Sequence, residues 1–326
     1  MNKIKLFAKI LICSVAALPV LCFVGCKGGY ETKECIINED FNNITLLLDT
    51  SNVEILPSDG ENTRVVYQQK KNLTHRATVN DGTLNIGVSD TRKWFQKLFN
   101  VGGPSVTVYL PKSEYSALYF RSDTGNLSVS SSFKLVGADI ATDTGDVDFG
   151  ASVSGGLKIE VSTGDVSVTS AETGSLTLSA TTGDVSVGGV NAGGAVSVVT
   201  STGDISLKNI NCASLYTEVT TGKTDISAVN CESFISRGST GDLNMSSLVA
   251  NGKIDIARST GDVKFSGCDG AEVYIKVDTG DVRGSFLTDK VIFASTSTGK
   301  ISVPKLTSGG RCEIETDTGN IDISIN

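Results

Sequence analysis

The chain has 326 residues, of which 39% are hydrophobic and only 6% aromatic, and it contains 35 glycines. So few aromatic residues argue against a thick globular core, and so many glycines indicate frequent tight turns. With 36 acidic against 28 basic residues, the net charge is −8. Such a body is a poor match to nucleic acid, whose affinity comes mainly from Lys and Arg at phosphates. Because His75 is the only histidine, mechanisms that need two imidazoles and histidine-rich metal sites are excluded.

The N-terminus has the pattern of an export signal. Three lysines precede an apolar run over 10–24, as in secretory signal peptides, and the run is marginal as a membrane span. It ends in LCFVGC, which looks like a bacterial lipoprotein box with Phe23 where that pattern usually has Leu. We therefore predict a lipoprotein-type signal peptide over 1–25, acylation of Cys26 as a membrane anchor, and a tether over 26–40. Ordinary cleavage and an uncleaved anchor are the alternatives, and all three place the body in the extracytoplasmic cell envelope.

Residues 41–115 predict a less regular β region. The stretch 49–53 imitates the repeat that follows later in the chain, with Ser51 where that repeat has glycine, so it is a degenerate first coil. Asp81-Gly82 between alternating runs predicts a tight hairpin. The segment 106–110 is a further strand, closed by Pro111.

Within this region, residues 91–103 (TRKWFQKLFNVGG) place four apolar side chains at helical spacing. The simpler interpretation is a short amphipathic cap over the end of the fold, because repeat folds need covered ends. The alternative is an exposed hydrophobic loop that contacts lipid or a partner. We favour the cap and keep partner contact open for Trp94, Phe95, Leu98 and Phe99.

Residues 116–326 form a repeat. Thr-Gly recurs at intervals of 19 or 20 residues, with the glycines at 125, 145, 164, 183, 203, 222, 241, 261, 280, 299 and 319. Positions two and four after each glycine, and five and seven before it, are mostly apolar, so each unit reads as strand, bend and strand. A third inward position, seven after the glycine, is occupied by Val190, Ile210, Val229, Leu248, Cys268, Leu287 and Leu306.

A unit this short cannot bury its apolar side alone, so successive units must stack. The sequence predicts an all-β fold: a parallel β-solenoid of about eleven coils of 19–20 residues, right-handed by the rule for parallel crossovers. A propeller is the rival, but its blades need about 40 residues. The chain stops in strand-like residues 321–326 without a visible cap. We expect that end to be shielded by polar side chains or to associate end to end with another copy.

The run VTVYLPKSEYSALYFRSDTGNLSV at 106–129, followed by repeated STGDV and DTGDV units, resembles a bacterial family of β-strand-repeat proteins known as "putative adhesins". The resemblance covers roughly 41–326. It implies a surface or envelope protein with a β-solenoid fold, and some members accompany envelope-stress systems. The family has no established catalytic residues.

Seven aspartates directly follow a Thr-Gly corner and share one column. Stacked carboxylates could bind Ca²⁺, but that ion takes about 6–8 oxygens, whereas the column supplies one carboxylate per coil and is interrupted by Lys223 and Lys300. We therefore favour turn capping, in which the side chain accepts backbone N–H groups. The column consists of Asp146, Asp165, Asp184, Asp204, Asp242, Asp262 and Asp281.

The same aspartates make poor catalysts. Two carboxylates suffice for glycoside hydrolysis, but a cleft on a solenoid needs insertions between coils, and the regular intervals leave none. Equivalent positions also cannot tune one carboxylate as acid and another as base. We predict no enzyme activity, no catalytic residue, no metal and no cofactor. The complete threonine column before the glycines predicts a structural hydroxyl ladder rather than an ice-binding face.

The cysteines of the body show no zinc spacing. Cys212 and Cys231 lie 19 residues apart at equivalent positions, so we expect them on adjacent coils, and whether they form a disulfide stays open. Cys268 and Cys312 occupy inward columns and are expected to be buried.

Together these patterns predict a non-enzymatic, adhesin-like or scaffolding β-solenoid at the cell surface. It would bind an unidentified surface protein or glycan through its repetitive walls or loops. The alternative is a cell-envelope stress sensor or regulator that contacts membrane or peptides through residues 91–103.

Overall fold

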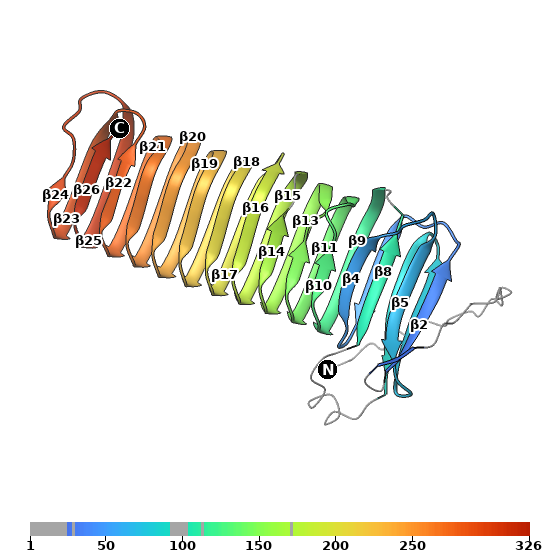
Figure 1. Cartoon of the computed structure of the whole chain (residues 1–326). Helices are drawn as coiled ribbons and strands as arrows, with labels where there is room; N and C mark the ends of the chain where they lie inside the picture. The colour runs from blue at the N-terminus through green and yellow to red at the C-terminus, as the bar shows by residue number, and fades with distance from the viewer. Residues whose placement is uncertain (1–24, 28–29, 92–103, 112–113, 170–171) are drawn as a thin grey trace, which may run out of the picture.

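The computed structural model describes residues 25–27, 30–91, 104–111, 114–169 and 172–326. All named elements in these ranges are β-strands, joined in one sheet that winds into a rod (Figure 1). This confirms the predicted β-solenoid, while its hand stays a prediction. Among the described residues, none form a helix of the length and hydropathy needed to cross a membrane.

The N-terminal third begins with short and partly antiparallel strands. They are β1 (Gly25–Lys27), β2 (Tyr30–Ile37), β3 (Asn43–Leu48), β4 (Asn52–Pro57), β5 (Thr63–Gln69), β6 (Leu73–Asn80), β7 (Thr83–Asp90) and β8 (Ser105–Leu110).

The regular solenoid follows. Its strands are β9 (Glu114–Thr124), β10 (Leu127–Val129), β11 (Lys134–Thr144), β12 (Val147–Phe149), β13 (Ser152–Thr163), β14 (Val166–Thr169), β15 (Glu172–Thr182), β16 (Val185–Ala192), β17 (Ala195–Thr202), β18 (Ile205–Thr221), β19 (Thr224–Thr240), β20 (Leu243–Thr260), β21 (Val263–Thr279), β22 (Val282–Phe286), β23 (Lys290–Thr298), β24 (Ile301–Ser302), β25 (Gly310–Thr318) and β26 (Ile321–Ile325).

The Thr-Gly corners stack directly on one another. Every corner glycine except Gly299 donates its N–H to the threonine carbonyl of a neighbouring corner, at 2.8–3.0 Å. These bonds connect all eleven corners. The corner glycines have φ between +126° and +159°, a region that is essentially restricted to glycine. The repeat is therefore held in register by its backbone at one edge of the rod.

Each coil has a second corner six residues after the first. In the central coils its residue has a left-handed φ between 52° and 66°, at Gly189, Asn209, Ala228, Ser247 and Gly267. The five positions between the two corners form what we call the short wall. The strand that leads up to the Thr-Gly corner forms the long wall. Because side chains alternate along a strand, each wall sends one set of residues outward and one into the core.

The core is a bundle of apolar files along the rod axis. Positions two and four after the corner glycine, and five and seven before it, are buried in nearly all coils, as predicted, and the largest fully buried side chains include Phe120, Phe149 and Phe234. Thr217 and Ser236 are polar members of the inward files and lie wholly buried, with a 2.9 Å hydrogen bond between their hydroxyls.

At the N-terminal end, the degenerate first coil and the Asp81-Gly82 hairpin form as predicted. Ser51 lies beneath Gly125 in the corner stack. Asp81 and Gly82 have φ of 49° and 70° between the antiparallel strands β6 and β7. The coil made of β3 and β4 is not outermost, because β7 and β8 pair with its far side.

Antiparallel strands then close this end of the sheet. β5 pairs with β8, and β2 pairs with β5 over seven residues. Residues 30–37, which we expected in a tether, therefore form strand β2, because the open edge of β5 offers them a full ladder of backbone partners.

At the C-terminal end, the coils do not follow chain order, which corrects the predicted sequential stack. β25 and β26 insert between β21–β22 and β23–β24. The last residues are thus sandwiched, and the uncovered end of the rod is β23–β24. Pro304 gives the reason: it follows β24 closely, and a residue without an N–H is tolerated at a sheet edge but not inside a ladder.

Two inward assignments at this end were wrong. Leu287 is 48% exposed, and Phe286 is buried in its place, because the pairing of β21 with β22 shifts register between Phe265 and Cys268. Ile301 is 45% exposed, because no further coil covers it. Leu306 is half-buried in the loop between β24 and β25.

End-to-end self-association stays a prediction, now assigned to a different surface. Among the described strands, β23 and β24 pair on one side only, and Phe293 of β23 is 58% exposed. A strictly monomeric species at high concentration would contradict the prediction.

The corner stack gives a direct test. A Cβ at Gly203 would collide with the carbonyl oxygen of Gly183, at a φ of +138°. We expect Gly203→Ala to lower the free energy of unfolding by about 3 kcal/mol or more, from steric collision and backbone strain. Gly188→Ala is the matched control, because nothing lies within 4 Å of its Cβ. Urea denaturation of both variants measures the difference, and equal stabilities would contradict the stacking account.

Candidate functional site

Two groups of sequence-predicted site residues are not placed. Trp94, Phe95, Leu98 and Phe99 lie outside the described residues, as do residues 1–24 of the signal peptide predicted over 1–25. Cys26 lies in β1, in register with Glu31 of β2. Its acylation stays a prediction.

The aspartate column forms a hydrogen-bonded ladder. The Oδ1 atom of each of its seven aspartates accepts the backbone N–H of the residue at the same position in the next coil, at 2.7–2.9 Å. Asn126 and Asn52 make the same bond at the start of the rod. This is the geometry that turn capping requires, and it uses one carboxylate oxygen of each residue.

The ladder follows the spatial order of the coils. Asn320 donates its N–H to Asp281, and Lys300 donates to Asn320. Lys300 is therefore the last rung, where no further coil needs an acceptor. Lys223 is the one interruption inside the rod, since its own N–H is accepted by Asp204 but its side chain has no oxygen to offer.

The carboxylates of the ladder also pair with cations on the short wall. Lys264 Nζ lies 2.9 Å from Asp262 Oδ2, and Arg283 Nη2 lies 2.6 Å from Asp281 Oδ2. The pKa of Asp262 is lowered, mainly by the N–H of Asp281 and then by Lys264. Within the described ranges, no three His, Cys, Asp or Glu side chains are grouped so as to hold a metal ion.

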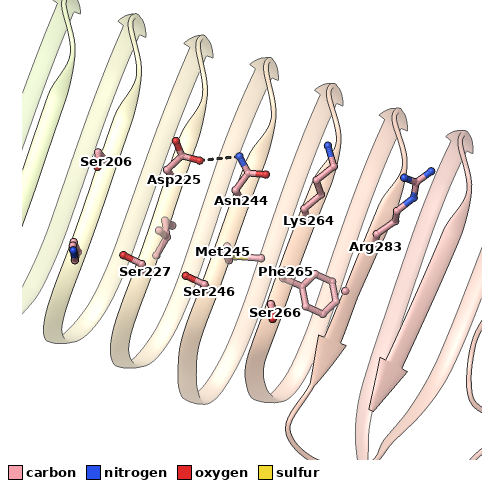
Figure 2. Close-up of a pocket in the computed structure, with 13 residues that line it drawn as sticks. Ser206, Asp225, Ser227, Asn244, Met245, Ser246, Lys264, Phe265, Ser266 and Arg283 are labelled. Atoms are coloured by element: carbon pink, nitrogen blue, oxygen red, sulfur yellow. Dashed lines mark hydrogen bonds between the residues drawn. The ribbon is translucent and has the colours of Figure 1, made fainter. Parts of the chain in front are cut away.

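A surface hollow lies on the short wall and spans five adjacent strands, β18 to β22. It has a volume of about 490 Å³. Figure 2 shows its outward side chains in two rows across the coils. Three and five residues after the corner glycines stand Ser206, Asp225, Asn244, Lys264 and Arg283 in one row, and Lys208, Ser227, Ser246 and Ser266 in the other. We call this surface the short-wall groove.

The apolar floor of the groove changes in side-chain size at Gly284. Gly284 occupies a position that holds an apolar side chain in most coils, and a Cβ there would collide with the Phe265 ring. That ring leans toward Phe286, with centroids 4.8 Å apart. Met245 and Phe265 lie beneath the polar rows, each 5% exposed.

Polar side chains form both rows of the groove, while the apolar floor beneath them supplies most of its exposed lining. Asn244 Nδ2 donates to Asp225 Oδ1 at 2.8 Å, a bond drawn in Figure 2. The Lys264 and Arg283 side chains are 45% and 53% exposed despite their ion pairs. Lys208 makes no ion pair with any described residue. Donors and acceptors thus repeat along the rod axis at the strand spacing of about 4.8 Å.

A serine–histidine pair was missed by sequence reasoning. Ser51 Oγ lies 2.8 Å from His75 Nε2, but the two residues are 0% and 5% exposed. Burial lowers the pKa of His75 to about 4. Because no substrate can reach Ser51, the pair joins β6 to the first corner and is no nucleophile–base pair.

The fold and wall define a class of protein: an all-β repeat solenoid with a polar, repetitive surface. The chain belongs to the Toastrack DUF4097 family, whose model matches residues 41–235 and again 194–326. This confirms the resemblance to the adhesin-like repeat family. No curated protein matches the sequence.

Solved structures of similar proteins carry related names. A "putative adhesin" from Parabacteroides distasonis shares 13% identity over 90% of this chain and 96% of that chain, with a TM-score of 0.45. A "putative adhesin" from Bacteroides fragilis shares 15% over 90% and 97%, with a TM-score of 0.35. A "putative lipid binding protein" from P. distasonis shares 14% over 90% and 97%, with a TM-score of 0.41. Identities this low transfer no ligand to this chain, and none of these names indicates an enzyme.

The ladder is testable at one rung. Asp184 accepts the N–H of Asp204 at 2.7 Å. We expect Asp184→Ala to lower the free energy of unfolding by about 1 kcal/mol, the net value of one hydrogen bond. Asp184→Asn keeps an acceptor oxygen, as Asn126 does, and should lie near wild type. Urea denaturation distinguishes them, and an asparagine variant as unstable as the alanine variant would contradict turn capping.

His75 should make stability depend on pH. Its pKa is about 4 in the folded chain against 6.5 ordinarily, so between these values the unfolded chain binds more protons. Stability is therefore complete above pH 6.5 and falls as the pH drops toward 4, by up to about 3 kcal/mol.

The matched variant is His75→Gln, which can still hydrogen-bond Ser51 but does not titrate. Unfolding by urea across this pH window should show a flatter slope for the variant than for the wild type. Parallel slopes would show that His75 is not the titrating group.

Proposed function

We propose that this protein is a non-enzymatic, cell-surface solenoid that binds an extended glycan chain along the short-wall groove. The observation that carries the proposal is the groove itself: two rows of polar side chains, repeated over five coils, above a shallow apolar floor. A polymer of polar units can contact several coils at once, so weak individual contacts add up.

The backbone of the groove argues for a glycan over a peptide. Each strand from β18 to β21 pairs with a neighbour on both sides along the short wall. No free sheet edge is therefore available there, and a peptide could not add as an extra strand. Recognition must proceed through side chains, and hydroxyl, amide and ammonium groups suit a polyhydroxylated ligand.

The cations of the groove favour a glycan with some anionic groups. The body as a whole is acidic, and the groove is lined by Lys208, Lys264 and Arg283 and by one carboxylate, Asp225. Two of these cations already have carboxylate partners just outside the lining, so among the described residues of the groove Lys208 is the cation that an anionic group would meet unpaired. Lys264 and Arg283 are held in place by Asp262 and Asp281. Because these side chains are already ordered, they lose less conformational entropy when a ligand binds than unpaired side chains would.

The cell-surface location is part of the proposal. The N-terminal pattern and the adhesin names of similar structures support it. In this arrangement lipid on Cys26 anchors the chain, and the rod holds the groove away from the membrane.

Affinity electrophoresis tests the groove. The purified chain is run through gels containing neutral or acidic polysaccharides, and we expect retardation of the wild type, stronger with the acidic ones. Ser227→Gln/Ser246→Gln fills the groove with longer uncharged side chains and should weaken binding at least about tenfold, equivalent to 1.4 kcal/mol.

The matched control is Ser239→Gln/Ser259→Gln, which alters exposed serines of the same strands β19 and β20 on the long wall. These variants should run as the wild type does. Absence of retardation, or equal loss in both pairs, would contradict the proposal.

The same assay separates the alternative role as an envelope-stress regulator. Trp94→Ala/Phe95→Ala should leave retardation unchanged if the groove is the site. The regulator would be favoured if the wild type bound no polysaccharide and the Trp94→Ala/Phe95→Ala variant lost the envelope-stress response.

A further inference from the structure

Two thiols lie side by side on adjacent coils, at positions that do not line the short-wall groove. Cys212 of β18 and Cys231 of β19 are register partners, each nine residues after its corner glycine. The same position holds Ala192 in the coil below and Ala250 in the coil above, both small and buried. The two cysteines are therefore flanked along their file by alanines, so no large side chain covers them from the neighbouring coils.

The pair lies at the edge of a surface hollow, with Cys212 the more exposed of the two thiols. Cys212 is half-buried and Cys231 is 5% exposed. Both line a hollow of about 420 Å³. Asn211 and Asn230 flank them, joined by a 3.1 Å hydrogen bond between their side chains. Contact between the thiols lowers the pKa of Cys212 and raises that of Cys231.

The strand geometry suits a bridging ion better than a disulfide. Register partners on parallel strands lie about 4.8 Å apart, and their side chains extend in the same direction. Backbones about 4.8 Å apart lie within the range that disulfides use, but a disulfide needs its sulfurs at about 2.05 Å, so the two side chains would have to turn toward each other from their parallel directions. Two metal–thiolate bonds of about 2.3 Å each span the existing separation without moving the backbone.

We propose that Cys212 and Cys231 form a two-thiolate site for a soft monovalent cation of the Cu(I) class. Thiolates select such ions, and a d¹⁰ monovalent ion is satisfied by two ligands in line. A divalent ion such as Zn²⁺ wants four ligands, and no third or fourth His, Cys, Asp or Glu joins the pair in the described structure. Binding exchanges two protons for one cation: P(SH)₂ + M⁺ → [P(S–M–S)]⁻ + 2 H⁺.

The surroundings fit this reaction. Within the described chain, Glu232 lines the same hollow without being grouped with the thiols as a ligand; its carboxylate attracts an incoming cation but raises the pKa of Cys231, so the metal itself must displace the thiol protons. Because two protons are released, affinity should rise with pH.

The test uses the reduced full chain without oxygen. Cu(I) is supplied as its coloured bicinchoninate complex, and transfer to protein is followed by loss of colour. We expect the wild type to take up one more equivalent than Cys212→Ser/Cys231→Ser. Each single variant should bind that equivalent on the order of 100-fold more weakly, because the second thiolate no longer acts intramolecularly. Cys35→Ser, which alters a cysteine outside the pair, should keep it.

A second readout keeps the proposal independent of folding. Circular dichroism should show the same β-structure in all variants, and Cu(I) should raise the melting temperature of the wild type but not of the double variant. Equal uptake by wild type and double variant would overturn the proposal. A second result would also overturn it: glutathione disulfide oxidises the two thiols even when Cu(I) is present. The pair would then be a disulfide site.

Discussion

The structure depends on one steric constraint: at each Thr-Gly corner, successive backbones pass too closely for any side chain. A Cβ on almost any corner glycine would meet a backbone oxygen of the coil beneath, so the corners are glycine and their N–H groups reach the next threonine carbonyl. Once the corners are stacked, every other position is fixed in a file along the axis. The aspartate ladder beside the corner then satisfies the N–H that would otherwise face solvent.

The ends of the rod obey the same constraint with different solutions. At the N-terminal end, β7 and β8 complete a coil beneath β3 and β4, and antiparallel strands β5 and β2 cover it. At the C-terminal end, the chain turns back and inserts its last coil one place inward. The exchange is permitted because every interval is 19 or 20 residues, so the corners and ladder close equally well in either order.

That equivalence sets how much could be predicted from sequence. The period and the residue type of each column are local properties, so the sequence was enough to predict the fold, the hairpin, the degenerate corner at Ser51 and the inward files except at the C-terminal end, where Leu287 and Ile301 are exposed. The order of the coils could not be predicted, because the period is the same for both orders; only Pro304 indicates which coil lies at the edge.

Arg258 shows a second limit of prediction from sequence. It is 3% exposed at an inward position, donates to Ser236 Oγ at 2.8 Å, and occupies space left by Gly238. Burial lowers its pKa to about 10. In the sequence, Gly238 and Arg258 both depart from an inward column that otherwise holds Ser, Thr, Ala or Val, which indicates a local change in packing. Only the structure shows that the two residues contact each other.

The candidate sites follow from departures within otherwise uniform files. In a regular solenoid each coil presents the same surface, so a ligand can distinguish one region only where a file changes residue type. The short-wall groove lies where Lys264 and Arg283 follow smaller polar residues and where Gly284 interrupts an apolar file. The thiol pair lies where two cysteines interrupt alanines. The corners, which tolerate no change, are for the same reason poor places for recognition. Structure and binding are thereby divided between positions of one repeat: the invariant corner holds the rod together, and the variable wall is free to specify what it binds.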